Sequence, residues 1–355
     1  MLKRSAKLLL TALHRSFFPL HKELLINAVC MAFSITLAIF IAKSFNLPAP
    51  YWAGISAMMV IMPTLSGMLR KGLMRLFGTY LGAFLGLMAI KFGLATYPWL
   101  FFCVLFITIA VPLACMQNAR YPYAWLIGGI TCDMVMLAGL VNPAQTLDYA
   151  QARAIEITIG AVSSLSFYFL ITQFGKISYQ VEIKDRRKRP LHALAGGRTR
   201  AALAGGLAGC AAVGLWLHFH FNGIEQSVTS VWVLSFSGTA FDTYHKGFQR
   251  FGGCLVGGIV AAILLFIPTI YPVFLFLVFC FCLLSCIVQN GPLYGRYFGL
   301  QAAFAFLIVY ANTEGAEPAM FRLLSIVNGL VLVLVFSVVI GIIVNHFPER
   351  FLKKT

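Results

Sequence analysis

The chain has 355 residues, of which 60% are apolar and only 11% are charged, and its mean hydropathy is strongly positive. A soluble fold of this size needs more polar surface, so the composition excludes it. The net charge of +16 does not indicate nucleic-acid binding, because the cations stand in short segments between apolar runs. The sequence therefore predicts an all-α polytopic membrane protein with about twelve transmembrane helices, each of roughly the 20 residues that a bilayer requires.

Residues 1–24 are basic and contain one short apolar run. This pattern is typical of a cytoplasmic segment and not of a cleaved signal peptide, and the segment is either amphipathic and at the membrane surface or a solvated tail. A first repeat of six helices is predicted over residues 25–175, at 25–45, 51–67, 72–93, 97–117, 121–141 and 153–174. The second helix is short and ends in a run of hydroxyl residues and glycine. Thr64 and Ser66 in this run are candidates for an interrupted helix end that lines a transport path.

Cations and glycines are regularly spaced at the start of the third predicted helix. Arg70, Lys71 and Arg75 precede glycines that recur every four residues from Gly78. One interpretation is structural, since such cations orient the protein and bind lipid headgroups while the glycines allow close helix packing. We favour a functional one, because cations beside a helix amino terminus also attract anions. The three cations are therefore candidates for substrate binding at the inner mouth.

The fifth and sixth predicted helices carry the other candidates of this repeat. Tyr121 opens the fifth helix and is a candidate for lining the path. Asp133 stands near the middle of the same helix, where a carboxylate must face a cavity or a partner, and it is a candidate for proton coupling. The alternative is a buried hydrogen bond to a neighbouring hydroxyl. Arg153 and Glu156 are outer-side candidates whose spacing allows an ion pair.

The second half of the chain resembles the first. A basic cytoplasmic linker is predicted at 176–198, a second six-helix repeat at 199–345 and a basic cytoplasmic tail at 346–355. The predicted helices of the second repeat are 199–219, 227–242, 248–268, 271–289, 293–311 and 321–345. The motif of Lys71, Gly72, Arg75, Gly78 and Gly82 recurs 175 positions later as Lys246, Gly247, Arg250, Gly253 and Gly257.

The repeated motif adds further candidates in the second half. They are Lys246 and Arg250 for substrate binding, Ser237, Thr239 and Tyr294 for the path, and Arg322 on the outer side. No acid stands at the position equivalent to Asp133. Most of the 27 lysines and arginines fall on one side if both termini are cytoplasmic. Six helices per repeat then place the two repeats in parallel.

Other classes of site find no support in the sequence. The nine cysteines stand mostly inside apolar runs, where they act as small packing residues. We find no metal-ligand spacing and no arrangement of nucleophile and base. No enzymatic activity, metal, cofactor or nucleic-acid partner is therefore expected.

The stretch PYWAGISAMMVIMPTLSGMLRKGLMRLFGTYLGAFLG resembles the signature of the fusaric acid resistance protein family, which includes the aromatic acid exporters. The signature has an aromatic pair, then a proline and small hydroxyl residues, then R-K-G-x-x-R-x-x-G-T-x-x-G. The matching residues are Tyr51, Trp52, Pro63, Thr64, Arg70, Lys71, Gly72, Arg75, Gly78, Thr79 and Gly82. The second half departs from it, with no proline for Pro63 and Cys254 in place of Thr79.

The resemblance implies a multi-pass transporter of the bacterial inner membrane that exports small organic anions, notably aromatic carboxylic acids. Many members carry large cytoplasmic domains after each membrane half, and the chain departs from them, so a compact form of the family is expected. Its two repeats either enclose one path by themselves or form it in a homo-oligomer. The short outer loops argue against a periplasmic adaptor protein. Two mechanisms remain open: secondary export coupled to protons, and a voltage-driven anion channel or uniporter.

Overall fold

The computed structural model describes residues 2–17, 22–62, 64–118, 120–175, 195–219, 224–235, 240–291, 293–311 and 317–346. Helices and short turns make up these residues, which contain no strand, so the all-α prediction is confirmed. Ser237, Thr239, Pro63, linker residues 176–194 and tail residues 347–355 lie outside the described ranges.

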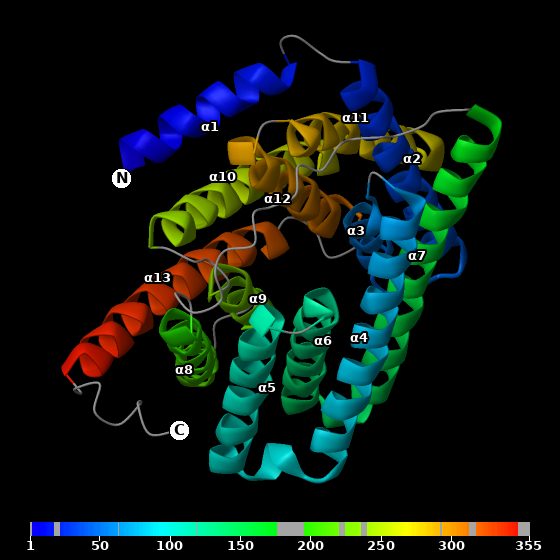
Figure 1. The fold of residues 1–355 in the computed structure, drawn as a ribbon. Helices are drawn as coiled ribbons and strands as arrows, with labels where there is room; N and C mark the ends of the chain where they lie inside the picture. The colour runs from blue at the N-terminus through cyan, green and yellow to red at the C-terminus, as the bar shows by residue number, and fades with distance from the viewer. Residues whose placement is uncertain are drawn as a thin grey trace.

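Figure 1 labels the helices in chain order. Those of the first half are α1 (Leu2–Phe17), α2 (Lys22–Ser44), α3 (Tyr51–Val60), α4 (Leu65–Lys91), α5 (Pro98–Asn118), α6 (Pro122–Val141) and α7 (Thr146–Gly175), with single turns at Leu94–Thr96 and Pro143–Gln145. Those of the second half are α8 (Ala195–Phe219), α9 (Ile224–Ser235), α10 (Ala240–Leu265), α11 (Tyr271–Asn290), α12 (Leu293–Tyr310) and α13 (Glu317–His346).

Nine of the described helices are long and apolar enough to cross a membrane: α2, α4, α5, α6, α7, α8, α10, α11 and α13. The helix α12 fits its predicted range but is not among these nine. The predicted span 51–67 was too long, because α3 ends at Val60 and α4 begins at Leu65. Within the predicted span 227–242, residues 236–239 lie outside the described ranges. The described helices α3 and α9 have 10 and 12 residues. At about 1.5 Å per residue they reach roughly half of the 30 Å hydrocarbon core.

The end of α3 follows from the local sequence. Ile61 is extended, with φ −60° and ψ 129°. Pro63 lacks a backbone N–H and disfavours helix at the residue before it. Thr64 then caps α4, because its Oγ1 accepts a hydrogen bond from the backbone N–H of Gly67 at 3.2 Å. Thr64 and Ser66, the predicted helix break, are exposed beside this cap.

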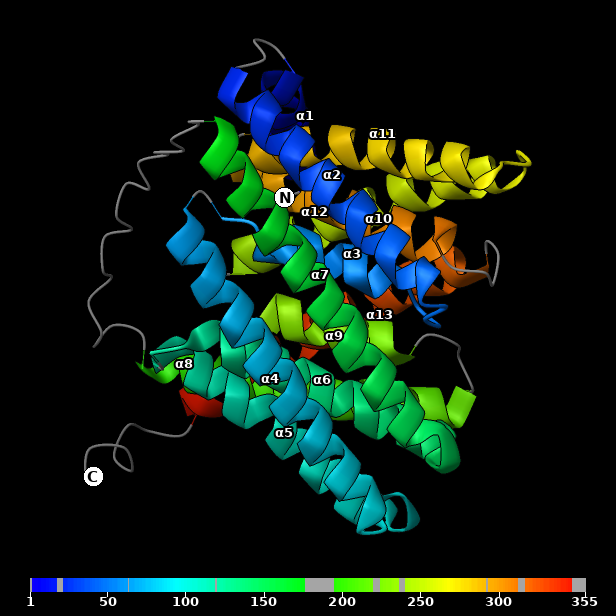
Figure 2. The same ribbon diagram turned by 90° about the vertical axis from the view of Figure 1, so that its right-hand side faces the viewer.

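Corresponding helices of the two halves make corresponding contacts. The helix α4 packs along α6 and α10 along α12, while α3 packs on α7 and α9 on α13. Across the halves, α5 packs on α8 and α2 on α11. Figure 2 shows the two short helices, α3 and α9, in the middle of the molecule.

The motif glycines explain how closely these helices approach. A Cβ at Gly82 would overlap the carbonyl oxygen of Gly128 on α6. A Cβ at Gly257 of α10 would likewise overlap the carbonyl oxygen of Ala302 on α12. The glycines therefore allow backbone-to-backbone packing, as the small-residue spacing predicted.

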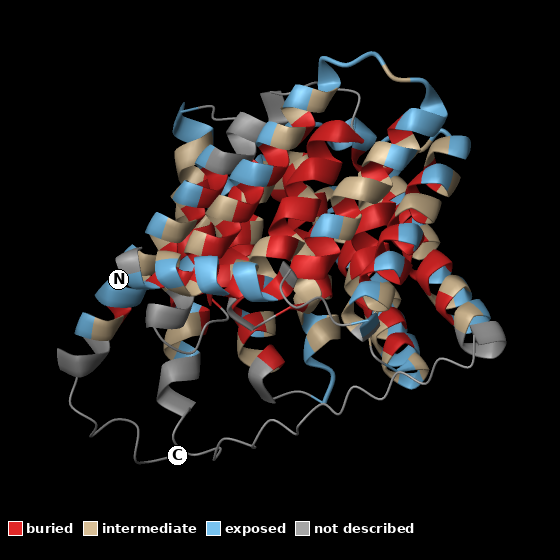
Figure 3. Ribbon diagram, turned by 90° about the horizontal axis from the view of Figure 1, so that it is seen from above, coloured by how far each residue is buried: buried red, intermediate tan, exposed pale blue. Residues whose placement is uncertain are grey.

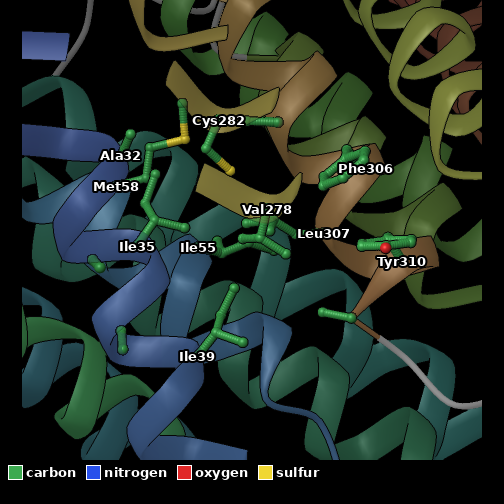
Figure 4. Close-up of a cluster of buried hydrophobic side chains, with 14 of the residues drawn as sticks. Ala32, Ile35, Ile39, Ile55, Met58, Val278, Cys282, Phe306, Leu307 and Tyr310 are labelled. Carbon is green, nitrogen blue, oxygen red and sulfur yellow. The ribbon is translucent and has the colours of Figure 1, made fainter. Parts of the chain in front are cut away.

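Buried residues are concentrated in the inner parts of the helices (Figure 3). One apolar cluster joins α2, α3, α11 and α12, and Figure 4 shows Ile35, Ile39, Met58, Val278 and Leu307 within it. A second cluster joins α5, α6, α8 and α9. The helix α1 packs against α10, α11 and α12. Its buried residues Ser5, Leu9, Ala12 and Ser16 lie on one face.

Candidate functional site

A cavity of about 1070 Å³ lies among α4, α5 and α6. Its volume is close to the upper end of the roughly 300–1,000 Å³ typical of small-molecule pockets. One face of α4, from Arg70 to Leu85, forms a wall, and most of the lining is apolar or aromatic. The lining residues are Arg70, Leu73, Met74, Phe77, Gly78, Leu81, Gly82, Leu85, Thr108, Pro112, Arg120, Tyr121, Ala124, Trp125, Gly128, Gly129 and Cys132.

Two arginines stand at the end of the cavity that the sequence places on the cytoplasmic side. The Cζ atoms of Arg70 and Arg120 lie 5.6 and 5.5 Å from the ring centroid of Tyr121. Arg70 also donates a hydrogen bond of 3.4 Å to the backbone carbonyl of Arg120. Both side chains are exposed. Guanidinium groups bind carboxylates well, so this end of the cavity suits an anion.

Asp133 is completely buried just beyond the opposite end of the cavity. Its Oδ1 accepts a hydrogen bond of 2.6 Å from the hydroxyl of Thr108, and its Oδ2 accepts one of 2.7 Å from the indole N–H of Trp232. Thr108 lines the cavity and therefore connects it to the carboxylate. Pro112, one turn later in α5, has no N–H, so the carbonyl of Thr108 loses its usual helical donor.

Trp232 comes from the other half of the chain, on α9. Its indole ring fills the space beside Gly129, where any Cβ would overlap it. Asp133 therefore hydrogen bonds across the contact between the two halves. No sequence pattern predicted this partner, because 99 residues separate the two.

The second half has an apolar counterpart of this site. Ser56 pairs with Ser230 and Tyr123 with Tyr297 at an offset of 174 positions, one less than in the cation motif. At this offset the counterparts of Trp232, Thr108 and Asp133 are Met58, Cys282 and Leu307. All three belong to the apolar cluster of Figure 4. A buried carboxylate thus occurs at only one of these two positions.

Arg75 and Arg250 occupy equivalent buried positions. Arg75 donates to the hydroxyls of Ser56 on α3 and Tyr123 on α6, at 2.9 and 2.8 Å. Arg250 makes the corresponding bonds to Ser230 on α9 and Tyr297 on α12, at 3.2 and 3.3 Å. It also donates to Gln301 at 2.9 Å.

These bonds hold the short helices against their neighbours, which favours an anchoring role for Arg75 and Arg250 over contact with substrate. Lys71 is half-buried, with its Nζ 5.4 Å from the ring centroid of Tyr123. Lys246 is half-buried one turn before Arg250. Of the predicted substrate-binding cations, Arg70 alone is among the residues that line the cavity. Arg120, which the sequence did not single out, joins it and could have been found from its place beside Tyr121.

The outer-side candidates Arg153 and Glu156 lie on α7 beside the starts of the short helices. Arg153 stacks on the ring of Trp52, with 3.9 Å from Cζ to the ring centroid, and donates to the hydroxyl of Tyr149 at 2.5 Å. That hydroxyl lies 3.2 Å from both carboxylate oxygens of Glu225 on α9. Glu156 accepts a hydrogen bond of 2.8 Å from the backbone N–H of Ala49.

Two further candidates fall where only the backbone is described. Tyr294 lies in α12 and Arg322 in α13, and their side chains are outside the described part of the structure. Within the described residues, no group of three His, Cys, Asp or Glu side chains is placed to hold a metal ion.

Two family models match the chain. That of the fusaric acid resistance protein family matches residues 28–181, and that of the fusaric acid resistance protein-like group matches residues 207–336. The comparison with solved structures found no match.

Curated relatives are similar to part of the chain. The uncharacterized transporter YdhK of Escherichia coli K12 is 31% identical over 145 residues, which are 38% of this chain and 20% of that protein. YdhK of Salmonella typhimurium is 33% identical over 138 residues, with the same two shares. The p-hydroxybenzoic acid efflux pump subunit AaeB of Escherichia coli K12 is 29% identical over 149 residues, which are 39% of this chain and 23% of that protein. The chain spans about a fifth of the length of these relatives.

Proposed function

Because the chain belongs to the fusaric acid resistance protein family, we propose that it is a membrane transporter that exports small organic anions, aromatic carboxylates among them. The efflux of p-hydroxybenzoic acid named for a relative supports this substrate class. The observation that carries the proposal is the cavity, which has arginines at one end and an apolar, aromatic wall. An aromatic carboxylate has the same division into a charged end and an apolar ring.

In this proposal the carboxylate binds Arg70 and Arg120, and the ring lies against Phe77 and Trp125. Desolvating the anion is costly, and two guanidinium groups offset that cost. The apolar wall then contributes the burial of the ring, at roughly 25 cal/mol per Å². The same walls would discriminate against small hydrophilic anions, which bury no such surface.

The transport frame consists of two parallel six-helix repeats with both termini in the cytoplasm. Matching contacts of α4 with α6 and of α10 with α12 support this arrangement. Matching hydrogen bonds of Arg75 and Arg250 support it too. The distribution of lysine and arginine supports the orientation. The short helices α3 and α9 lie at the centre and interrupt the membrane-spanning pattern, as helices do at transporter binding sites.

Asp133 couples the export to protons in this proposal. It is buried, and Thr108, which lines the cavity that we assign to the path, donates a hydrogen bond to it. Protonation would remove the charge that the Thr108 hydroxyl and the Trp232 indole now stabilise. The strength of the contact between the two halves would then depend on whether Asp133 is protonated, as proton coupling requires. Where the carboxylate has no such role, export follows the membrane potential alone, as in a channel or uniporter.

The proposal is tested by the flux of 4-hydroxybenzoate into and out of proteoliposomes that contain the full chain. Replacing both Arg70 and Arg120 by glutamine should lower the initial rate at least about tenfold, because each charge-assisted hydrogen bond contributes about 1.5–3 kcal/mol. Phe77→Ala should lower it as well. Phe84→Ala is the matched control, since Phe84 lies two turns further along α4 and is also exposed, at 55% against 64% for Phe77, but is not among the residues that line the cavity.

Equal rates in the arginine variant and the unaltered protein would refute the cavity as the substrate site. Equal losses in Phe77→Ala and Phe84→Ala would show a general effect on α4 and contradict the assignment of the wall. Protein-free vesicles measure the leak of the protonated acid through the lipid.

A further inference from the structure

Arg153 lies between the amino-terminal ends of the two short helices, outside the cavity described above. It is 4% exposed and projects from α7. Trp52 in the first turn of α3 stacks on its guanidinium. Glu225 in the first turn of α9 lies on the far side of Tyr149. Residues of both halves therefore meet around one buried cation.

The guanidinium holds more hydrogen-bond donors than its neighbours use. Its Nη2 donates to Tyr149, but its Nε and Nη1 are buried and have no hydrogen-bond partner. The indole N–H of Trp52 is also buried without a partner. Leaving a buried donor unpaired costs about 1–3 kcal/mol, and more for a charged group. Buried donors are nearly always paired in folded proteins, so three unpaired ones at one place indicate a binding site for an acceptor.

The nearby carboxylates already have other donors. Glu156 accepts the backbone N–H of Ala49, just ahead of α3, and Glu225 accepts the hydroxyl of Tyr149. These two carboxylates therefore leave the Nε and Nη1 hydrogens of Arg153, which point from different edges of the guanidinium, for a further acceptor. The amino termini of α3 and α9 add partial positive charge near it.

We propose that Arg153 and Trp52 form a second binding site for the carboxylate of an organic anion, at the outer end of the path between α3 and α9. The inference rests on the proposed function and adds to it a site on the predicted outer side. The carboxylate accepts one hydrogen bond from an unpaired N–H of the Arg153 guanidinium and one from the indole N–H of Trp52, because Nε and Nη1 point from different edges and a single carboxylate cannot reach both. Trp52 and Tyr149 are only half-buried, so movement of these two rings opens the site.

An aromatic anion suits this place better than a small inorganic one. The rings of Tyr51 and Trp52 lie 5.7 Å apart, and Tyr149 faces the guanidinium at 4.9 Å. Aromatic rings in offset or edge contact stabilise one another by about 0.5–1.5 kcal/mol beyond the area they bury. The site therefore selects carboxylate and ring together, as does the cavity at the other end of the path.

The test is the stoichiometry of labelled benzoate bound at equilibrium to the full chain in lipid nanodiscs, with benzyl alcohol as the neutral control ligand. In the Arg70→Gln variant the cavity site is weakened, and one saturable benzoate site should remain. Adding Arg153→Gln should weaken this remaining site at least about tenfold. Unchanged binding in the doubly substituted, folded protein overturns the proposal, as does equal binding of benzyl alcohol.

A second variant keeps the test decisive if Arg153→Gln fails to fold. Trp52→Phe retains a ring for Arg153 to stack on and removes only the N–H, and it should weaken the remaining site about tenfold. Trp99→Phe, at an exposed position on α5, is the matched control and should leave it unchanged. Equal affinity in Trp52→Phe and Trp99→Phe overturns the proposal. If transport fails in the Arg70 and Arg120 variant while this site persists, the two proposals are separated.

Discussion

Replacing Asp133 by asparagine removes the group that can bind and release a proton but keeps the hydrogen bonds of this site. The amide oxygen can accept from the Trp232 indole, which now lies 2.7 Å from Oδ2. The amide nitrogen can donate to the Thr108 hydroxyl, which also bonds to the carbonyl of Leu105 at 3.0 Å and can keep that bond. Asparagine thus satisfies both partners but cannot be ionised.

The cost in stability follows from the two hydrogen bonds. A hydrogen bond to a charged group contributes about 1.5–3 kcal/mol and a neutral one about 0.5–1.5 kcal/mol. Asp133→Asn should therefore lower the free energy of unfolding by no more than about 3 kcal/mol. Asp133→Leu, which copies Leu307 of the other half, leaves the Trp232 N–H buried without an acceptor and should be the less stable of the two.

The effect on transport is larger. At zero membrane potential, one exchanged proton per substrate corresponds to about 1.4 kcal/mol for each unit of pH gradient, or a tenfold accumulation. We expect Asp133→Asn to reduce this accumulation to near unity. A potential of 100 mV alone contributes about 2.3 kcal/mol per charge, roughly 50-fold, and should still drive the anion through the variant.

The assay follows 4-hydroxybenzoate in proteoliposomes whose potential is clamped with potassium and valinomycin. The pH gradient and the potential are imposed separately, and protein-free vesicles serve as the control for leak. A tenfold accumulation per pH unit in Asp133→Asn would refute proton coupling at this residue. Accumulation that follows the potential alone in both proteins would favour the channel or uniporter.

Two further predictions concern the frame. Gly82→Ala should lower the free energy of unfolding by about 1–3 kcal/mol, because its Cβ meets the backbone of α6. A Cβ at Gly214 would have nothing within 4 Å, so Gly214→Ala should leave the melting temperature unchanged or raise it slightly. Equal shifts of the melting temperature in the two variants would contradict the packing argument. Ser56→Ala and Ser230→Ala each remove the acceptor of a buried arginine Nε and should lower the stability by a similar 1–3 kcal/mol. A loss in only one of them, measured by thermal unfolding in detergent, would argue against equivalent halves.

Much of the fold follows from local sequence, and this part was predicted well. Long apolar runs indicate helices, and the predicted range 121–141 differs from α6 by one residue at its start. The prediction failed at 51–67, where hydropathy continues past Val60, the point at which the backbone leaves the helix. Hydropathy measures the preference of side chains for lipid, and it does not register the break before Pro63.

The sequence predicted residues of the candidate site but not how they are arranged. Sequence spacing identified the cations around Arg70 and Arg75, but both stand on one helix, and nothing local separates an exposed guanidinium from a buried one. The structure places Arg70 at the cavity and commits Arg75 to Ser56 and Tyr123. Which side of a helix meets another helix depends on packing between segments far apart in the chain.

The sequence by itself determined that this protein is helical and membrane-embedded, because the bilayer imposes the same length and polarity on every crossing segment. It also determined the repeated cation-and-glycine motif. Only the tertiary structure decided which residues meet: Asp133 with Trp232, and Arg153 with Trp52 and Tyr149. The physical reason is that a buried polar group must find its partner in space. In a bundle of many helices that partner stands on whichever helix the packing brings alongside.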